Sequence, residues 1–108
     1  MVNKKSCCGT TETHKHEMPS DDVVKKQAEY CKALSDPARV RIIYALADKD
    51  LCVCELIDIL QMQQTTVSHH LKVLKYAGII EDRKSGQWVY YSLTDKKVLD
   101  ALKTLGAE

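Results

Sequence analysis

An amphipathic helix that ends at a glycine and leads straight into strand-like sequence is the feature that most constrains this fold. Residues 64–77 place Val67, Leu71 and Leu74 on one face, which is the spacing of a half-buried helix. Gly78 follows, and glycine commonly ends helices because it adopts the left-handed conformation without steric cost. We therefore predict one helix over 64–77, with one face buried and the opposite face exposed.

Two short strand-like runs, 79–83 and 88–93, come directly after this helix. Residues 84–87 are predicted to form the turn between them. A two-stranded hairpin is only marginally stable in water by itself. This hairpin must therefore pack against the preceding helices, as the wing of a winged helix does.

Apolar periodicity predicts further helices on both sides of this unit. Asp36 and Pro37 suit the N-cap and the first position of a helix that runs to about Asp48. Its predicted inner residues are Val40, Ile43, Tyr44 and Ala47. The other predicted helices cover about 21–34, then 52–60 with Leu56, Ile59 and Leu60 buried, and a C-terminal segment that begins near 94–95. This order predicts a mainly α fold with a small β-hairpin, a winged helix-turn-helix.

Length and composition fit one small domain. The chain has 108 residues, 44% of them hydrophobic and 29% charged, which allows a modest core and makes dimerisation a reasonable expectation. No apolar run approaches the length of a membrane span and no signal peptide is apparent, so we expect a cytoplasmic protein without a membrane partner. The net charge is only +1, and charge alone therefore does not establish nucleic-acid binding.

The exposed face of the helix over 64–77 favours contact with DNA. It offers hydroxyl, imidazole and ammonium groups and no carboxylate, which suits phosphate oxygens and base edges in a major groove. An ordinary solvated helix face is the alternative, but the order helix–turn–helix then wing favours DNA. The candidate DNA-binding residues are Gln64, Thr65, Ser68, His69 and Lys72 on the helix, and Arg83, Lys84 and Gln87 on the wing. His70 points away from His69 and is predicted to be a partly buried packing residue.

The chain contains five cysteines: Cys7, Cys8, Cys31, Cys52 and Cys54. An odd number of cysteines in a chain without a secretion signal favours metal ligation or thiol sensing over a disulfide framework. Cys31 falls on the apolar stripe of the first helix and is predicted to be a core residue. Residues 1–20 lack hydrophobic periodicity, so we interpret them as a flexible arm that carries Cys7 and Cys8. The domain proper is then expected to span 21–108.

Four segments of the chain resemble the ArsR/SmtB family of metal-sensing repressors. They are 32–42 (KALSDPARVRI), similar to the second-helix signature; 51–56 (LCVCEL), similar to the thiolate box; 64–74 (QTTVSHHLKVL), similar to the recognition helix; and 90–93 (YYSL) in the hairpin. The resemblance covers about 25–105. It implies a winged-helix homodimer joined by the first and last helices, which represses an operon and releases operator DNA when metal binds.

Cys52 and Cys54 are the strongest chemical feature of the chain. Thiolates select soft or borderline ions such as Cd(II), Pb(II), Zn(II) or As(III), and two cysteines at a helix start can converge because the first lies half outside the helix. Two sulfurs are too few for a tight site, and position 57, where a third thiolate would complete an arsenite site, is Ile57. Cys7 and Cys8 on the arm are the candidates for the missing ligands. The resemblance to cadmium and lead sensors implies that the arm of one subunit covers the third helix of the other.

A second metal site on the last helix, which the family also has, is predicted to be absent. Asp95 fits its first position, but Lys97 stands where a histidine is expected, and no histidine follows His70.

Two other functions stay open at this point. One is a repressor whose cysteines form a disulfide as a redox signal; the other is a metal-buffering protein without DNA activity. An enzyme is not expected, because no nucleophile–base pair or glycine-rich phosphate loop is evident. The expected partners are operator DNA and a second copy of the chain, with no small-molecule substrate.

Overall fold

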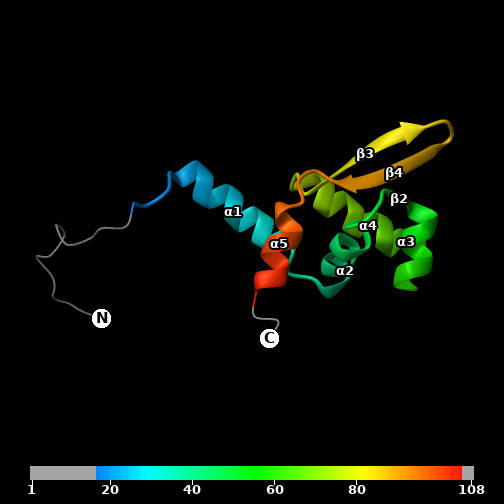
Figure 1. Ribbon diagram of the computed structural model, residues 1–108, viewed down its shortest axis with the longest axis horizontal. Helices are drawn as coiled ribbons and strands as arrows, with labels where there is room; N and C mark the ends of the chain where they lie inside the picture. Colours follow the sequence, from blue (N-terminus) through cyan, green and yellow to red (C-terminus); the bar gives the residue numbers. More distant parts are fainter. Residues whose placement is uncertain (1–16, 106–108) are drawn as a thin grey trace, which may run out of the picture.

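The computed structural model describes residues 17–105, and it is mainly helical with a small three-stranded antiparallel sheet (Figure 1). The predicted fold class, a winged helix-turn-helix, is confirmed. The elements in chain order are α1 (Asp21–Ala33), α2 (Pro37–Ala45), β2 (Leu51–Cys52), α3 (Val53–Leu60), α4 (Gln64–Tyr76), β3 (Ile80–Ser85), β4 (Trp88–Leu93) and α5 (Lys97–Thr104). The helix–turn–helix is formed by α3 and α4, and the wing by β3 and β4. No helix in the described part of the chain is long and apolar enough to cross a membrane.

Local capping explains where the helices that carry this unit begin and end. Asp36 caps α2 as predicted, with its carboxylate accepting a hydrogen bond from the Ala38 N–H at 2.8 Å and Pro37 at the first helical position. Gly78 ends α4 as predicted, with φ of +83°. The Ile79 N–H bonds the Leu74 carbonyl at 3.0 Å and the Gly78 N–H bonds the Lys75 carbonyl at 2.9 Å, which is a Schellman motif.

The wing has a tighter turn than the predicted one over 84–87. Strand β3 continues to Ser85 and β4 begins at Trp88, so that only Gly86 and Gln87 form the turn. Gly86 has φ of +63°, which a two-residue type II′ hairpin turn requires at its first position.

Strand β2 was not predicted, and it completes the sheet. Leu51 and Cys52 pair with Tyr91 and Tyr90 of β4, in the sheet order β2-β4-β3. Two residues are too few to show an alternating pattern. The predicted helix over 52–60 accordingly begins one residue later, at Val53, with Cys52 as its N-cap.

The core lies where α2, α3 and α4 meet the base of the wing. Its largest fully buried side chains are Ile42, Ile43, Leu56, Val67, Leu71, Leu74, Ile79 and Ile80. The predicted buried face of α4 is therefore confirmed. Two inner residues were predicted wrongly, since Tyr44 and Ile59 are exposed. Ile43 is buried as predicted, and its neighbour Ile42 is buried as well. Helix α2 ends at Ala45 and not at Asp48, and the buried Leu46 is its C-cap residue.

Helix α1 projects away from this core (Figure 1). Residues 21–29 are exposed, and Ala33 is the buried residue of the helix. The prediction that Cys31 is a core residue is wrong, because the apolar stripe of α1 does not reach the core of its own chain and Cys31 is exposed. Tyr30, Cys31 and Leu34 instead face α5 across an apolar groove of about 640 Å³. The α5 side of the groove is lined by Val98, Ala101, Leu102 and Leu105.

Candidate nucleic-acid interface and thiol site

The five candidate residues on α4 lie together on the surface. They line one shallow depression of about 330 Å³, whose residues are Gln64, Thr65, Ser68, His69 and Lys72. All five are exposed, while Val67, Leu71 and Leu74 on the opposite face are buried in the core. The apolar face thus fixes the helix in place, and the polar face is free to contact a ligand.

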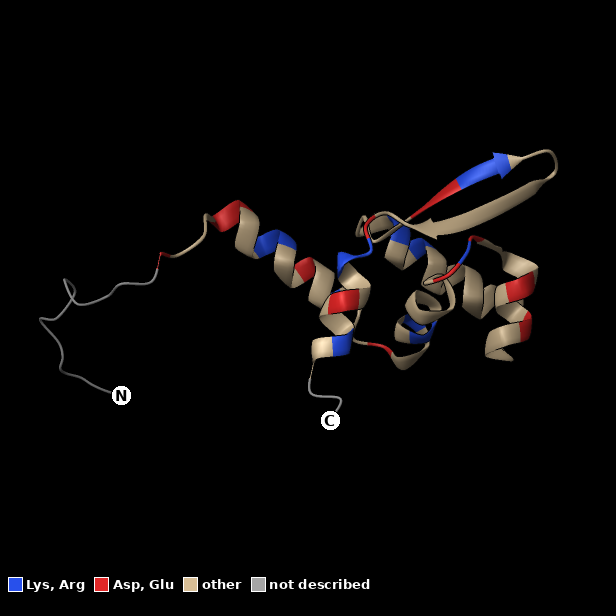
Figure 2. Cartoon of the chain, viewed as in Figure 1, with Lys and Arg blue, Asp and Glu red and all other residues tan. Residues whose placement is uncertain are grey.

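The tip of the wing carries two of its three candidate residues. Lys84 is the next-to-last residue of β3 and Gln87 is in the turn, and both are exposed. Figure 2 shows that the acidic residues of β3 lie at its start and the basic residues lie toward the tip. The end of the wing is therefore positively charged, which suits a phosphate backbone.

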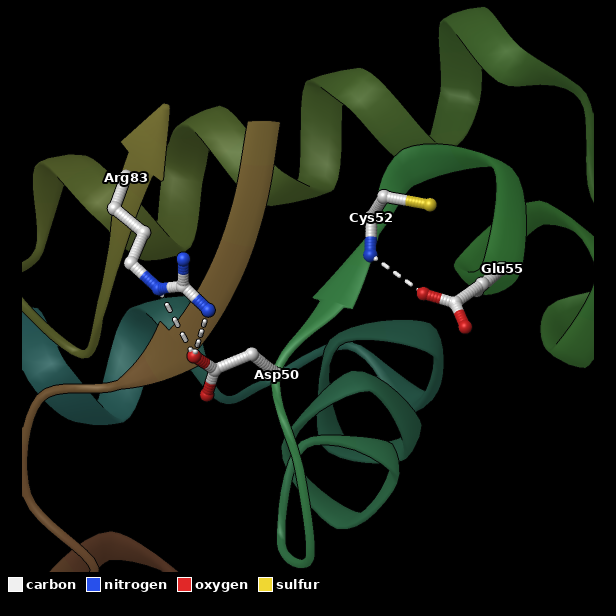
Figure 3. A network of polar contacts seen from close by, with 4 residues as sticks. All are labelled: Asp50, Cys52, Glu55 and Arg83. Carbon is white, nitrogen blue, oxygen red and sulfur yellow. Dashed lines mark hydrogen bonds and ion pairs between the residues drawn. The ribbon is translucent and has the colours of Figure 1, made fainter. Parts of the chain in front are cut away.

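Arg83, the third candidate on the wing, is held by an acidic partner that no sequence pattern predicts. Its Nε and Nη2 atoms donate to Oδ2 of Asp50 at 3.2 and 3.1 Å, as Figure 3 shows. The guanidinium also lies over the ring of Tyr90, 5.2 Å from its centroid, a cation–π distance. Contact of Arg83 with DNA would therefore compete with this ion pair.

Cys52 and Cys54 lie at the junction of the sheet and α3. Cys52 is half-buried, with extended φ and ψ of −89° and 169°, and Cys54 is exposed in the first turn of α3. Cys52 is therefore half outside the helix, as the predicted convergence of the two sulfurs requires.

Glu55 is a polar neighbour of this pair that the sequence analysis missed. The Cys52 N–H donates to Oε1 of Glu55 at 3.0 Å (Figure 3). This bond, together with a second from the Cys52 thiol, holds the pKa of the Glu55 carboxyl below its ordinary value. The signal was an N-cap residue followed three positions later by glutamate, the spacing of a capping box.

The described residues supply part of a metal site. Within 17–105, no three His, Cys, Asp or Glu side chains gather closely enough to hold an ion. The two thiols at the start of α3 have the chemistry that soft ions prefer, but they need further ligands. The predicted ligands Cys7 and Cys8 lie outside the described residues.

The remaining site predictions concern single residues. His70, predicted to be a partly buried packing residue, is buried. Asp95 accepts a hydrogen bond from the Lys97 N–H at 2.9 Å and so contributes to the start of α5. The absence of a metal site there stays a prediction.

The chain is similar to bacterial and archaeal regulators. A family model described as "Bacterial regulatory protein, arsR family" matches residues 36–82, from the N-cap of α2 into β3. An HTH-type transcriptional regulator of Methanocaldococcus jannaschii is 45% identical over 80 residues, which is 73% of this chain and 90% of the relative. A cadmium resistance transcriptional regulatory protein CadC homolog of Staphylococcus aureus is 41% identical over 101 residues, covering 87% of this chain and 84% of the relative.

Solved structures agree with the fold. The solution structure of a homodimeric winged helix-turn-helix DNA-binding domain from Mycobacterium bovis has a TM-score of 0.71 and 31% identity. The alignment covers 79% of this chain and 83% of that domain.

Proposed function

The chain belongs to the arsR family of bacterial regulatory proteins, and we propose that it is a homodimeric repressor that a soft metal ion releases from operator DNA. Family membership makes it a winged-helix transcriptional regulator and not an enzyme. We propose, in addition, which metal ions it responds to, which residues bind the ion, which helices form the dimer and which residues contact DNA.

The observation that carries the DNA-binding part is the division of α4 into two faces. Three of its apolar residues are fully buried, and five of its exposed polar residues line one depression without a carboxylate. A helix presented in this way can enter a major groove, with its N-terminal residues Gln64 and Thr65 toward the base edges. Lys84 and Gln87 at the wing tip would contact the backbone alongside.

The apolar groove between α1 and α5 supports dimerisation through these two helices. Val23 and Val24 are 46% and 43% exposed, and Leu105 is 67% exposed. Leu105 lines the groove, and Val23 and Val24 lie further along α1. Large exposed apolar surface marks interaction sites. A second copy of the chain would cover it, and a dimer would present two recognition helices to two successive grooves.

The proposed effector site is anchored by Cys52 and Cys54 and completed by Cys7 and Cys8 from the arm over 1–20. Its candidate ions are Cd(II), Pb(II), Zn(II) and As(III), and the name of the Staphylococcus aureus relative favours cadmium. When bound, such an ion would fix the two thiolates at the start of α3.

Movement at Cys52 has two routes to the DNA-binding surface. Cys52 is paired with Tyr90 of β4, and so belongs to the sheet of the wing. It is also the N-cap of α3, which packs on α4 across a three-residue link. The position of the wing and the position of the recognition helix therefore both depend on this residue.

The test compares operator affinity with and without each ion. Metal is expected to weaken binding by about 5- to 150-fold, the range of a typical coupling free energy. Cys52→Ser and Cys54→Ser should abolish both the weakening of operator binding by metal and the ultraviolet thiolate-to-metal absorption. The same two measurements on Cys7→Ser and Cys8→Ser test whether the arm supplies ligands. Cys31→Ser removes a thiol that is not a proposed ligand and is the control for the metal response. Because Cys31 lines the α1–α5 groove, the ratio of its affinities with and without metal is compared with that of wild type, and not the affinity itself. Equal affinities with and without metal would contradict the proposal, and sensitivity to peroxide alone would favour a redox switch.

A further inference from the structure

His70 is a buried polar residue that the proposed function does not use. It is 7% exposed, and it is the one polar side chain that is buried within residues 17–105. Its Nδ1 atom lies 3.1 Å from Nη1 of Arg39. Arginine carries only donors, so Nδ1 accepts this hydrogen bond.

The same guanidinium has a second fixed partner. Nε of Arg39 donates to the backbone carbonyl of Ala33 at 2.6 Å. Ala33 is the last residue of α1 and is buried at 3% exposure. Arg39 itself lies in the first turn of α2, whose N-cap is Asp36. One side chain on α2 therefore joins the end of α1 to the middle of α4.

This bridge connects the proposed dimer surface, the α1–α5 groove, with the proposed DNA-binding surface on α4. In a dimeric repressor the relative position of these two surfaces sets the spacing of the recognition helices. Tyr30 and Cys31 of α1 and its C-cap residue Leu34 line the apolar groove. All three lie within three positions of Ala33 in the chain. Helix α4 carries the candidate DNA-binding residues, among them the exposed His69, which directly precedes the buried His70. The Arg39 guanidinium is thus bonded both to the end of the helix that lines the groove and to the helix that carries the candidate DNA contacts.

We propose that Arg39 and His70 are positioning residues that set the distance between the two recognition helices of the dimer. The proposal rests on the proposed function and deepens it. If position 70 only had to pack, an apolar residue beside Val67, Leu71 and Leu74 would suffice there. A hydrogen bond to a planar guanidinium adds direction, because the donors of arginine are held in a rigid fork.

The experiment measures binding to paired and single half-sites. The probe is a palindromic duplex that the wild-type protein selects from a randomised pool. It is compared with the same duplex with one half scrambled, and with versions in which one or two base pairs are added or removed at the centre. Affinities are measured for wild type, Arg39→Lys, His70→Leu and His70→Asn, together with thermal unfolding of each.

Arg39→Lys keeps the charge but offers one ammonium in place of the fork, and His70→Leu removes the acceptor. Both are expected to weaken binding to the intact palindrome by about tenfold or more, the effect of losing a charged hydrogen bond, and to flatten its dependence on spacing. Binding to the single half-site should change by less than about twofold. His70→Asn should retain most of the wild-type preference, because its amide oxygen can take the place of Nδ1. Arg41→Lys is the matched control, since Arg41 is exposed on the same helix.

A loss on the palindrome no larger than the square of the loss on the single half-site would overturn the inference, because a direct DNA contact is lost once for each half-site bound and a folding defect lowers both affinities. Unchanged spacing dependence in both Arg39→Lys and His70→Leu would overturn it as well. Should His70→Leu fail to fold, Arg39→Lys and His70→Asn decide the question by the same comparison. Failure of the wild-type protein to select any duplex would instead refute the proposed function, and the positioning role with it.

Discussion

Removal of the Asp50 carboxylate is expected to strengthen DNA binding, because it frees Arg83. Both oxygen contacts of the pair are made to one atom, Oδ2, at 3.1 and 3.2 Å. The side chains are 59% exposed for Arg83 and 38% exposed for Asp50. An exposed pair of this kind contributes at most about 1 kcal/mol. In Asp50→Asn, that free energy is no longer lost when Arg83 turns to a phosphate, which corresponds to about a fivefold gain in affinity per subunit.

Salt dependence gives the same prediction independently. One additional phosphate contact steepens the slope of log affinity against log salt concentration by about 0.9. A dimer carries the substitution twice, so the slope should steepen by up to about 1.8. The contact with the Tyr90 ring, 5.2 Å from the guanidinium carbon to the ring centroid, does not involve the carboxylate and should hold the guanidinium on the wing in Asp50→Asn.

Fluorescence anisotropy of a labelled operator duplex over a series of salt concentrations measures both quantities. Asp48→Asn is the control, because Asp48 is exposed and changes the net charge equally. The double variant Asp50→Asn/Arg83→Gln should show no gain over Arg83→Gln. The reasoning is refuted if Asp48→Asn strengthens binding as much as Asp50→Asn does, or if the gain survives in the double variant.

Two further predictions concern stability. Gly78→Ala should lower the free energy of unfolding by about 1–2 kcal/mol, because an L side chain is strained at φ of +83°. Gly78→Asn should lose less, since asparagine tolerates this conformation; equal losses in urea denaturation would contradict the explanation. The bond from the Ala38 N–H holds the pKa of Asp36 below its ordinary value, so this carboxylate stabilises the fold at neutral pH and the contribution is lost as pH falls through the folded-state pKa. Asp36→Asn keeps the cap without the titration, and its urea midpoint should fall less between pH 7 and pH 3 than that of wild type.

The parts of the fold that were predicted correctly depend on local chemistry. The Asp36–Pro37 start of α2 and the Gly78 end of α4 are each encoded within a few residues. The buried face of α4 follows from its periodicity alone. The DNA-facing candidates on α4 come together for the same reason, because a helix places residues three and four apart side by side.

The parts that were missed depend on pairs far apart in the chain. Arg83 bonds Asp50 across 33 positions, and Arg39 approaches His70 across 31. Strand β2 exists because β4 is present to pair with it. No pattern in either partner signals such contacts, because each depends on how the helices and the wing pack. Glu55 lies between the two cases, since its capping spacing is local but only the structure shows that its partner is the thiol residue Cys52.

The exposure of α1 links folding, dimerisation and DNA binding in this chain. An isolated helix of about this length is marginal in water, and its stability normally comes from packing of its apolar face. Here that face opens onto the groove shared with α5, and Ala33 alone is buried in the chain's own core. A second copy would therefore stabilise α1 as well as bury the groove. Because Arg39 is bonded to the Ala33 carbonyl and to His70, a change in the order of α1 would reach α4, the proposed recognition helix, through this side chain. In the proposed dimer, the subunit contact would thus contribute to the geometry of DNA recognition in addition to doubling the number of recognition helices.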